Sequence, residues 1–199
     1  MAAAKEKITP TRLEAFSDGV IAIIITIMVL ELKVPHQDTL AGLAAQWPIF
    51  ISYALSFLLV AEYWMNHHML FHLIRHVGDR LLWSNLLVLF CISLIPFFTG
   101  FMGENHISAF SVAAYSAWAM VCAISFMVLL TAVFRHVDMK EEDKRCLRQA
   151  ALLKCCIAIV LYGLAVVAAP YSPMTALALN FVVAIMYFLP NTWLEKREA

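Results

Sequence analysis

The chain has 199 residues, of which 63% are hydrophobic and 14% are charged, and its mean hydropathy is +0.81. Soluble domains carry about 45–50% apolar and about 25% charged residues. This chain is more apolar and less charged than that, which excludes a soluble domain for most of its length. The net charge is zero and no basic tract lies outside the apolar segments, so the composition gives no indication of a nucleic-acid partner. Because a membrane-spanning helix needs about 20 apolar residues, the length fits six or seven spans.

Charge clusters, prolines and polar breaks divide the chain into six apolar segments that are each long enough to cross a bilayer. They cover residues 12–34, 48–74, 80–101, 108–134, 149–169 and 173–193. Arg12, Glu14 and Asp18 lie at the start of the first segment, which favours a retained span over a cleaved signal peptide. We therefore expect an all-α, polytopic membrane protein that forms one domain, residues 1–199, with six transmembrane helices.

The lysine and arginine residues predict the orientation of these spans, because positively charged loops stay in the cytoplasm. With six spans, Lys33 is alone on the side opposite the N-terminus. The other side then holds Lys5, Lys7, Arg12, Arg75, Arg80, Arg135, Lys140, Lys144, Arg145, Arg148, Lys154, Lys196 and Arg197. This asymmetry favours an even number of spans and predicts that both termini are cytoplasmic.

Polar side chains gather at one depth of the first three predicted spans. At about 1.5 Å per residue, Asp18 lies roughly 9 Å beyond Arg12, and His67 and His68 lie roughly 10 to 12 Å inward from Arg75. The residues that we expect to form one hydrogen-bonded network are Ser17, Asp18, Asn66, His67, His68, Trp83 and Asn85. Such a network either joins the helices structurally or makes Asp18, with a histidine, a proton relay or cation site.

The second span carries two further kinds of ionisable group. His68, His72 and His76 follow one another at intervals of four residues, which places them on one face of a helix, as in some metal or haem sites. The remaining histidines lie in loops or at helix ends, so packing contacts are favoured and no metal site is expected. Glu62 lies near the middle of the same span, and the sequence names no partner for it.

Motifs for enzymatic chemistry are absent from the sequence. There is no GxSxG, HExxH, Walker or GxGxxG motif, and the five cysteines have no metal-binding spacing. An enzyme is therefore not expected. The potassium-filter sequence TVGYG is also missing, so any pore must select ions by another device.

The first three spans carry a recognisable pattern. Arg12 is followed by Phe16-Ser17-Asp18, and Thr26 comes eight residues after the aspartate. The pattern continues with Trp64, His67, His68 and Phe71, then with Trp83-Ser84-Asn85 and Ile95-Pro96-Phe97. This pattern resembles the transmembrane protein 175 family of potassium channels, whereas the last three spans match that family mainly in length and hydrophobicity.

The resemblance implies a bacterial homotetramer in the inner membrane, in which the first helix of each chain lines a central pore for potassium ions without a cofactor. It assigns Ile23, Ile27 and Leu30 to apolar constriction rings and Thr26 to a polar layer between them. It also implies that Arg12, Phe16 and the neighbouring Ser17 and Asp18 lie off the pore and brace the first helix against the next two.

Helical geometry gives this assignment partial support. At about 100° per residue, Ile23, Ile27 and Leu30 fall within roughly 60° of one another, with Thr26 at the edge of this stripe. The helix is apolar nearly all round, however, so the pattern alone does not distinguish pore-lining residues from lipid-facing or core residues. We expect Ile23 to form the narrowest ring, which favours potassium because potassium sheds water more cheaply than sodium.

Three other interpretations remain open at the level of the sequence. The chief one is a proton- or ion-coupled small transporter that uses Asp18, Glu62 and the histidines of the second span, although neither repeats nor broken helices support it. The second is a haem- or quinone-binding membrane protein built on those histidines, and the third is a purely structural membrane protein.

Overall fold

The computed structural model describes residues 8–188, and these residues form helices with no β-strand. The helices are α1 (Pro10–Val29), α2 (Leu40–Ala44), α3 (Trp47–Phe71), α4 (Asp79–Ser93), α5 (Ile95–Glu104), α6 (Ala109–Val133), α7 (Glu141–Ala168) and α8 (Pro173–Phe188). The all-α class expected from the sequence is therefore confirmed.

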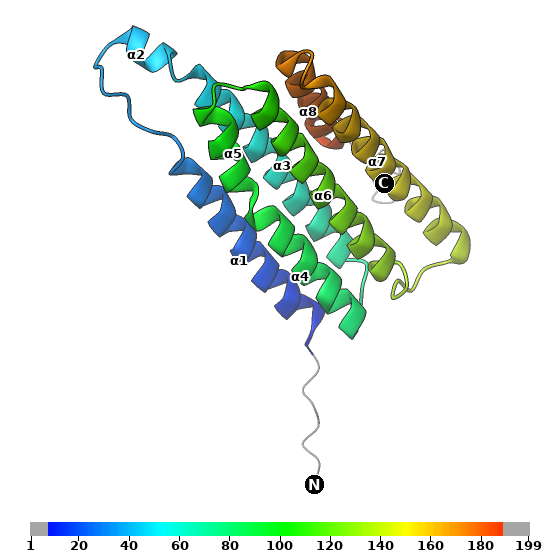
Figure 1. Cartoon of the computed structure of the whole chain (residues 1–199). Coiled ribbons are helices and arrows are strands. Elements are labelled where there is room, and N and C mark those ends of the chain that lie inside the picture. Colours follow the sequence, from blue (N-terminus) through cyan, green and yellow to red (C-terminus); the bar gives the residue numbers. More distant parts are fainter. Residues whose placement is uncertain (1–7, 189–199) are drawn as a thin grey trace.

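The helices form a bundle in which α1 lies along one edge and α7 and α8 lie along the opposite edge (Figure 1). Helix α1 packs against α3, α4 and α5, whereas α6 contacts α4, α5, α7 and α8. One side of α1 therefore faces the bundle and the other side faces away from it.

Local signals in the sequence fix where several helices begin. The Thr9 hydroxyl oxygen accepts a hydrogen bond from the Arg12 backbone N–H at 3.3 Å, and Pro10 occupies the first position of α1. The Ser108 hydroxyl oxygen likewise accepts from the Ser111 N–H at 3.3 Å. Such caps satisfy N–H groups that have no partner within the helix.

The third expected segment is not continuous. It divides at Leu94 into α4 and α5, and Pro96 lies in the first turn of α5. Proline has no N–H and clashes with the preceding turn, so the α4 hydrogen-bond pattern cannot continue through it. The segment expected over residues 80–101 therefore contains a break, although Asp79–Glu104 as a whole is long and apolar enough to cross a membrane.

Other boundaries also differ from the expected ones. Helix α1 ends at Val29 rather than at residue 34, and the short α2 was not expected. Helix α7 begins at Glu141 rather than at residue 149, because its acidic first turn of Glu141, Glu142 and Asp143 suits the positive end of the helix dipole. Residues 189–193 of the last expected segment lie outside the described residues.

Within residues 8–188, four helical segments are long and apolar enough to cross a membrane. These segments are Trp47–Phe71, Asp79–Glu104, Ala109–Val133 and Glu141–Ala168. Helix α8 is apolar but shorter, and α1 carries Arg12, Glu14 and Asp18 in its first half. The chain therefore has the helical segments of a polytopic membrane protein.

Buried polar side chains connect the helices in the interior. The Thr99 hydroxyl lies 2.7 Å from the Ser56 oxygen, and Ser56 donates to Tyr115 Oη at 3.1 Å, which joins α5, α3 and α6. Asn180 of α8 donates to the Ser116 oxygen of α6 at 2.8 Å. Hydrogen bonds between helices supply attraction that lipid-like side chains alone do not.

Candidate functional site

The side of α1 that faces the bundle is formed by residues three or four positions apart. They are Leu13, Ser17, Ile21, Ile24 and Met28, and all of them are buried. This spacing keeps side chains on one face of a helix. That face packs onto α3, α4 and α5.

The opposite side of α1 holds the residues that the resemblance assigns to the pore. Ile23, Thr26, Ile27 and Leu30 are all exposed, and Leu30 has 77% of its surface accessible. The Thr26 hydroxyl donates to the Ile23 carbonyl oxygen at 2.8 Å, so its hydrogen is already used within the helix. An apolar stripe on the edge of the bundle is thus left without cover from the described part of the chain.

A buried hydrogen-bonded chain fastens α1 to α3 and α4 near the N-terminal end of α1. Asn85 donates its amide N–H to the Ser17 hydroxyl oxygen at 2.9 Å, and Ser17 donates to the Leu13 carbonyl oxygen at 2.8 Å. The His67 Nε2 atom lies 2.7 Å from Asn85 Oδ1. Because an amide oxygen only accepts, His67 Nε2 carries the hydrogen.

A second set of contacts joins α1 to α3 closer to the surface. Trp64 Nε1 donates to Asp18 Oδ1 at 3.1 Å, and the Trp64 ring stacks on His68. His68 Nδ1 lies 2.9 Å from Glu14 Oε1, and His68 Nε2 lies 3.0 Å from His72 Nε2. The roles of Glu14 and Trp64 were missed from the sequence, although Glu14 lies one helical turn before Asp18.

Several residues expected in the network lie elsewhere. Asn66 donates to the Glu62 carbonyl oxygen at 2.8 Å within its own helix. Trp83 is 70% exposed and Phe16 is also exposed, while Arg12 contributes its backbone N–H to the helix cap. The structure thus divides the expected network into the buried Ser17–Asn85–His67 group and a second group, in which Asp18 bonds Trp64 and His68 stacks on the Trp64 ring.

The expected histidine face of the second span is shorter than predicted. Helix α3 ends at Phe71 with His72 as its C-cap, and His76 lies in the non-helical segment before α4. Ile74 instead forms an isolated β-bridge with Val137. The prediction that His76 shares a helical face with His68 and His72 was wrong, because the helix ends before His76.

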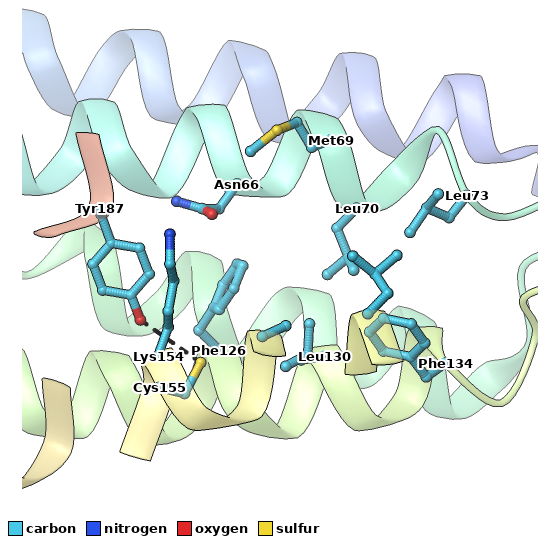
Figure 2. Close-up of a pocket in the computed structure, with 12 residues that line it drawn as sticks. Asn66, Met69, Leu70, Leu73, Phe126, Leu130, Phe134, Lys154, Cys155 and Tyr187 are labelled. Atoms are coloured by element: carbon cyan, nitrogen blue, oxygen red, sulfur yellow. Dashed lines mark hydrogen bonds between the residues drawn. The ribbon is translucent and has the colours of Figure 1, made fainter. Parts of the chain in front are cut away.

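Two cavities lie on the side of α3 that faces away from the hydrogen-bonded residues Ser17, Asn85 and His67. One cavity of about 80 Å³ has a mostly apolar lining from α3, α6, α7 and α8, and the Lys154 amine points toward Asn66 there (Figure 2). A smaller one of about 10 Å³ is lined by Glu62, and Glu62 Oε2 has no hydrogen-bond partner among the described residues. No residue of α1 lines either cavity, so neither belongs to the exposed stripe.

The amino-acid sequence is similar to proteins described as potassium channels. Residues 12–96 match the family model described as endosomal/lysosomal potassium channel TMEM175. A potassium channel from Chryseobacterium sp. (strain P1-3) is 38% identical over 94% of this chain and 97% of the relative. A second potassium channel, from Streptomyces collinus, is 33% identical over 94% of this chain and 96% of that relative.

A solved structure has the same fold. The crystal structure of a lysosomal potassium-selective channel TMEM175 homologue from Chamaesiphon minutus is 28% identical to this chain, with a TM-score of 0.81. The alignment covers 90% of this chain and 96% of the other. Together with the two relatives above, this shows that the chain belongs to the TMEM175 family.

Proposed function

We propose that the chain is a potassium channel that conducts ions passively through a pore lined by α1. The exposed apolar stripe of α1 carries this proposal, because one face of the helix is buried in the bundle and the other has no cover. The names of the two bacterial relatives support potassium as the permeant ion. Conduction of this kind requires no cofactor and no enzymatic step.

We infer that each chain crosses the bacterial plasma membrane six times, with α1 and α8 added to the four long segments. The 20 residues of α1 extend about 30 Å, which matches the hydrocarbon thickness. Lys33, just beyond α1, forms an ion pair with Glu104 at the end of α5, and this hydrogen bond raises the Lys33 pKa above its ordinary value. Lys33 is the one outside cation in this orientation, which leaves both termini cytoplasmic.

The pore itself forms when four chains bring their α1 stripes around a central axis. The stripe lies on the edge of the bundle, where another copy can approach without displacing α6, α7 or α8. Four helices that each present Ile23, Ile27 and Leu30 create successive apolar rings. A homotetramer thereby covers a surface that the single chain leaves exposed.

Ion preference in such a pore follows from dehydration. Rings of Ile23, Ile27 and Leu30 offer no oxygen to replace the water around an ion, so the ion with the cheaper dehydration, potassium, passes more readily. Small changes in ring width close the pore by dewetting. Because the Thr26 hydroxyl hydrogen is bonded to the Ile23 carbonyl, the Thr26 oxygen lone pairs remain available for a passing cation.

The buried hydrogen-bonded residues near the N-terminal end of α1 have a structural role in the proposed channel. Ser17, Asn85 and His67 fix the rotation of α1 about its own axis, so the stripe faces away from the bundle. The coupled-transporter interpretation finds little support in the same geometry. Asp18 bonds Trp64 beside α1, whereas Glu62 lines the cavity against α6, α7 and α8, so the two carboxylates do not share a site.

The test is the reversal potential of the purified protein in planar bilayers, first under a potassium gradient and then with sodium replacing potassium on one side. We expect a potassium-shifted reversal in the wild type. Ile23→Asn is expected to raise the current and weaken the preference, because an amide replaces the apolar ring. Ile185→Asn on α8 is the matched control, since Ile185 and Ile23 have nearly equal exposure, 57% and 58%.

The outcomes separate the interpretations. Equal selectivity in Ile23→Asn and wild type contradicts the assignment of the ring. If Ile185→Asn and Ile23→Asn weaken the preference for potassium equally, the loss is a general effect of a polar residue at the surface and not a property of the ring. Absence of any current contradicts the proposed channel function and favours the coupled transporter, which would use Asp18, Glu62 and the α3 histidines.

A further inference from the structure

A cluster of metal-ligating side chains lies where the end of α3 meets α1. Glu14, His68 and His72 each offer a ligand atom, and these three atoms lie within 4.8 Å of one another. His68 and His72 are one helical turn apart and both are accessible from the surface. The buried Ser17–Asn85–His67 chain does not include any of the three.

The contacts define where the lone pairs point. His68 Nδ1 lies 2.9 Å from Glu14 Oε1, and a carboxylate only accepts, so Nδ1 carries the hydrogen. His68 Nε2 therefore presents its lone pair on the other side of the ring. His72 Nε2 lies 3.0 Å from that atom, so His72 Nε2 donates its hydrogen to His68 Nε2 in this contact, and an ion that takes the place of this hydrogen lies between the two ring nitrogens.

We propose that His68 Nε2 and His72 Nε2 bind a transition-metal ion such as Zn²⁺, with Glu14 as the residue that orients His68. Zinc–nitrogen bonds of about 2.0–2.1 Å in tetrahedral geometry separate two ligand nitrogens by about 3.3 Å. The two rings need to open by only a few tenths of an ångström from their present contact. His72 binds with its hydrogen on Nδ1, and water completes the coordination.

The contact between Glu14 and His68 gives the proposed His68–His72 site a feature of established metal sites. Metal-bound histidines usually donate their second ring N–H to a carboxylate, which fixes the tautomer and strengthens the ligand. Glu14 belongs to α1, whereas both ligands belong to α3 and its cap. The sequence predicted no metal site because only the histidine spacing was visible, and the carboxylate comes from another helix.

Metal binding at this position stabilises the contact between α1 and α3. It holds the cap of α3 to the preceding turn and, through His68, tightens the contact to Glu14. The inference is independent of the proposed potassium conduction, because it concerns the cytoplasmic-side end of α1 rather than the exposed stripe.

The experiment is a titration of the purified, EDTA-treated full chain with ZnCl₂ by isothermal calorimetry. The background carries Cys146→Ser and Cys156→Ser, because these two exposed thiols offer competing ligands. We expect one saturable site per chain. His72→Gln should weaken binding at least tenfold, and Glu14→Ala should weaken it about 10- to 100-fold.

His76→Gln is the matched control, since His76 is an exposed histidine four residues away and outside the cluster. It should bind zinc as the background protein does. Saturating zinc should also raise the melting temperature of the background protein and of His76→Gln, but not of His72→Gln. Non-saturable binding, equal affinity in His72→Gln and background, or an equal loss in His76→Gln and His72→Gln overturns the site.

Discussion

The two faces of α1 differ in burial although they hardly differ in composition. Ile23 and Ile24 are adjacent and chemically identical, yet Ile23 is 58% exposed and Ile24 is 3% exposed. Ile24 packs into the bundle with Ile21 and Met28, whereas Ile23 lies on the outer stripe with Ile27 and Leu30. Apolar side chains on α1 therefore either pack into the bundle or form the exposed stripe.

The comparison shows what a hydrophobic pattern can and cannot establish in a membrane protein. In water, a helix signals its buried face by being polar on the other. In a bilayer both faces are apolar, so only packing distinguishes them. Substitutions on the two faces should consequently have opposite signatures, one in the free energy of unfolding and the other in ion selectivity.

The largest effect on stability is expected for Ile24→Ala. Truncation of this buried side chain leaves a cavity between α1 and the bundle, and we expect a loss of about 2 to 3 kcal/mol in the free energy of unfolding. The matched variant Ile23→Ala should change that free energy by less than about 0.5 kcal/mol. Unfolding in detergent, followed by circular dichroism, measures both, and equal losses contradict the difference between the faces.

A smaller effect is expected where the buried face is polar. Asn85→Leu removes the hydrogen bonds to Ser17 and His67, and we expect a loss of about 2 kcal/mol in the same measurement. Adding Ser17→Ala to Asn85→Leu should then cost little more, because the shared contact is already gone. Fully additive losses show that the two residues are not coupled.

The smallest effect is expected at the second contact between α1 and α3. Trp64→Phe keeps an aromatic ring beside His68 but removes the hydrogen bond to Asp18. We expect a loss of about 0.6 kcal/mol, the average for hydrogen bonds between helices in membranes. Asp18→Asn retains an oxygen acceptor and should lose less than Trp64→Phe, and the reverse order contradicts this role of the indole N–H.

The sequence predicted the helical class because long apolar segments have few other solutions in a bilayer. It did not predict the break at Leu94, although Pro96 is a visible signal for it. It placed Asn85, Ser17 and His67 at one depth, which depends only on helical rise. The exclusion of Trp83 and Asn66 from their network depends on rotation and side-chain direction, and those come from packing.

Glu14 shows the same limit at the candidate metal site. Its distance from His68 in the sequence gives no indication that the two side chains meet at 2.9 Å. Histidine spacing alone also suggested His76 as a third helical member, whereas the end of α3 at Phe71 excludes it. Contacts between α1 and α3 were therefore predicted as a layer of residues but not as pairs.

The most direct test of the central claim, that the exposed stripe of α1 lines the pore, is modification of single cysteines with a positively charged methanethiosulfonate reagent during current recording. Leu30→Cys lies at the far end of the stripe from the N-terminus, and Tyr171→Cys, in the exposed turn between α7 and α8 at the same end of the bundle, is the control. Both are made with Cys146→Ser and Cys156→Ser, and mass spectrometry confirms labelling. The account predicts that the reagent blocks potassium current through Leu30→Cys and spares Tyr171→Cys, and undiminished current through fully labelled Leu30→Cys contradicts it.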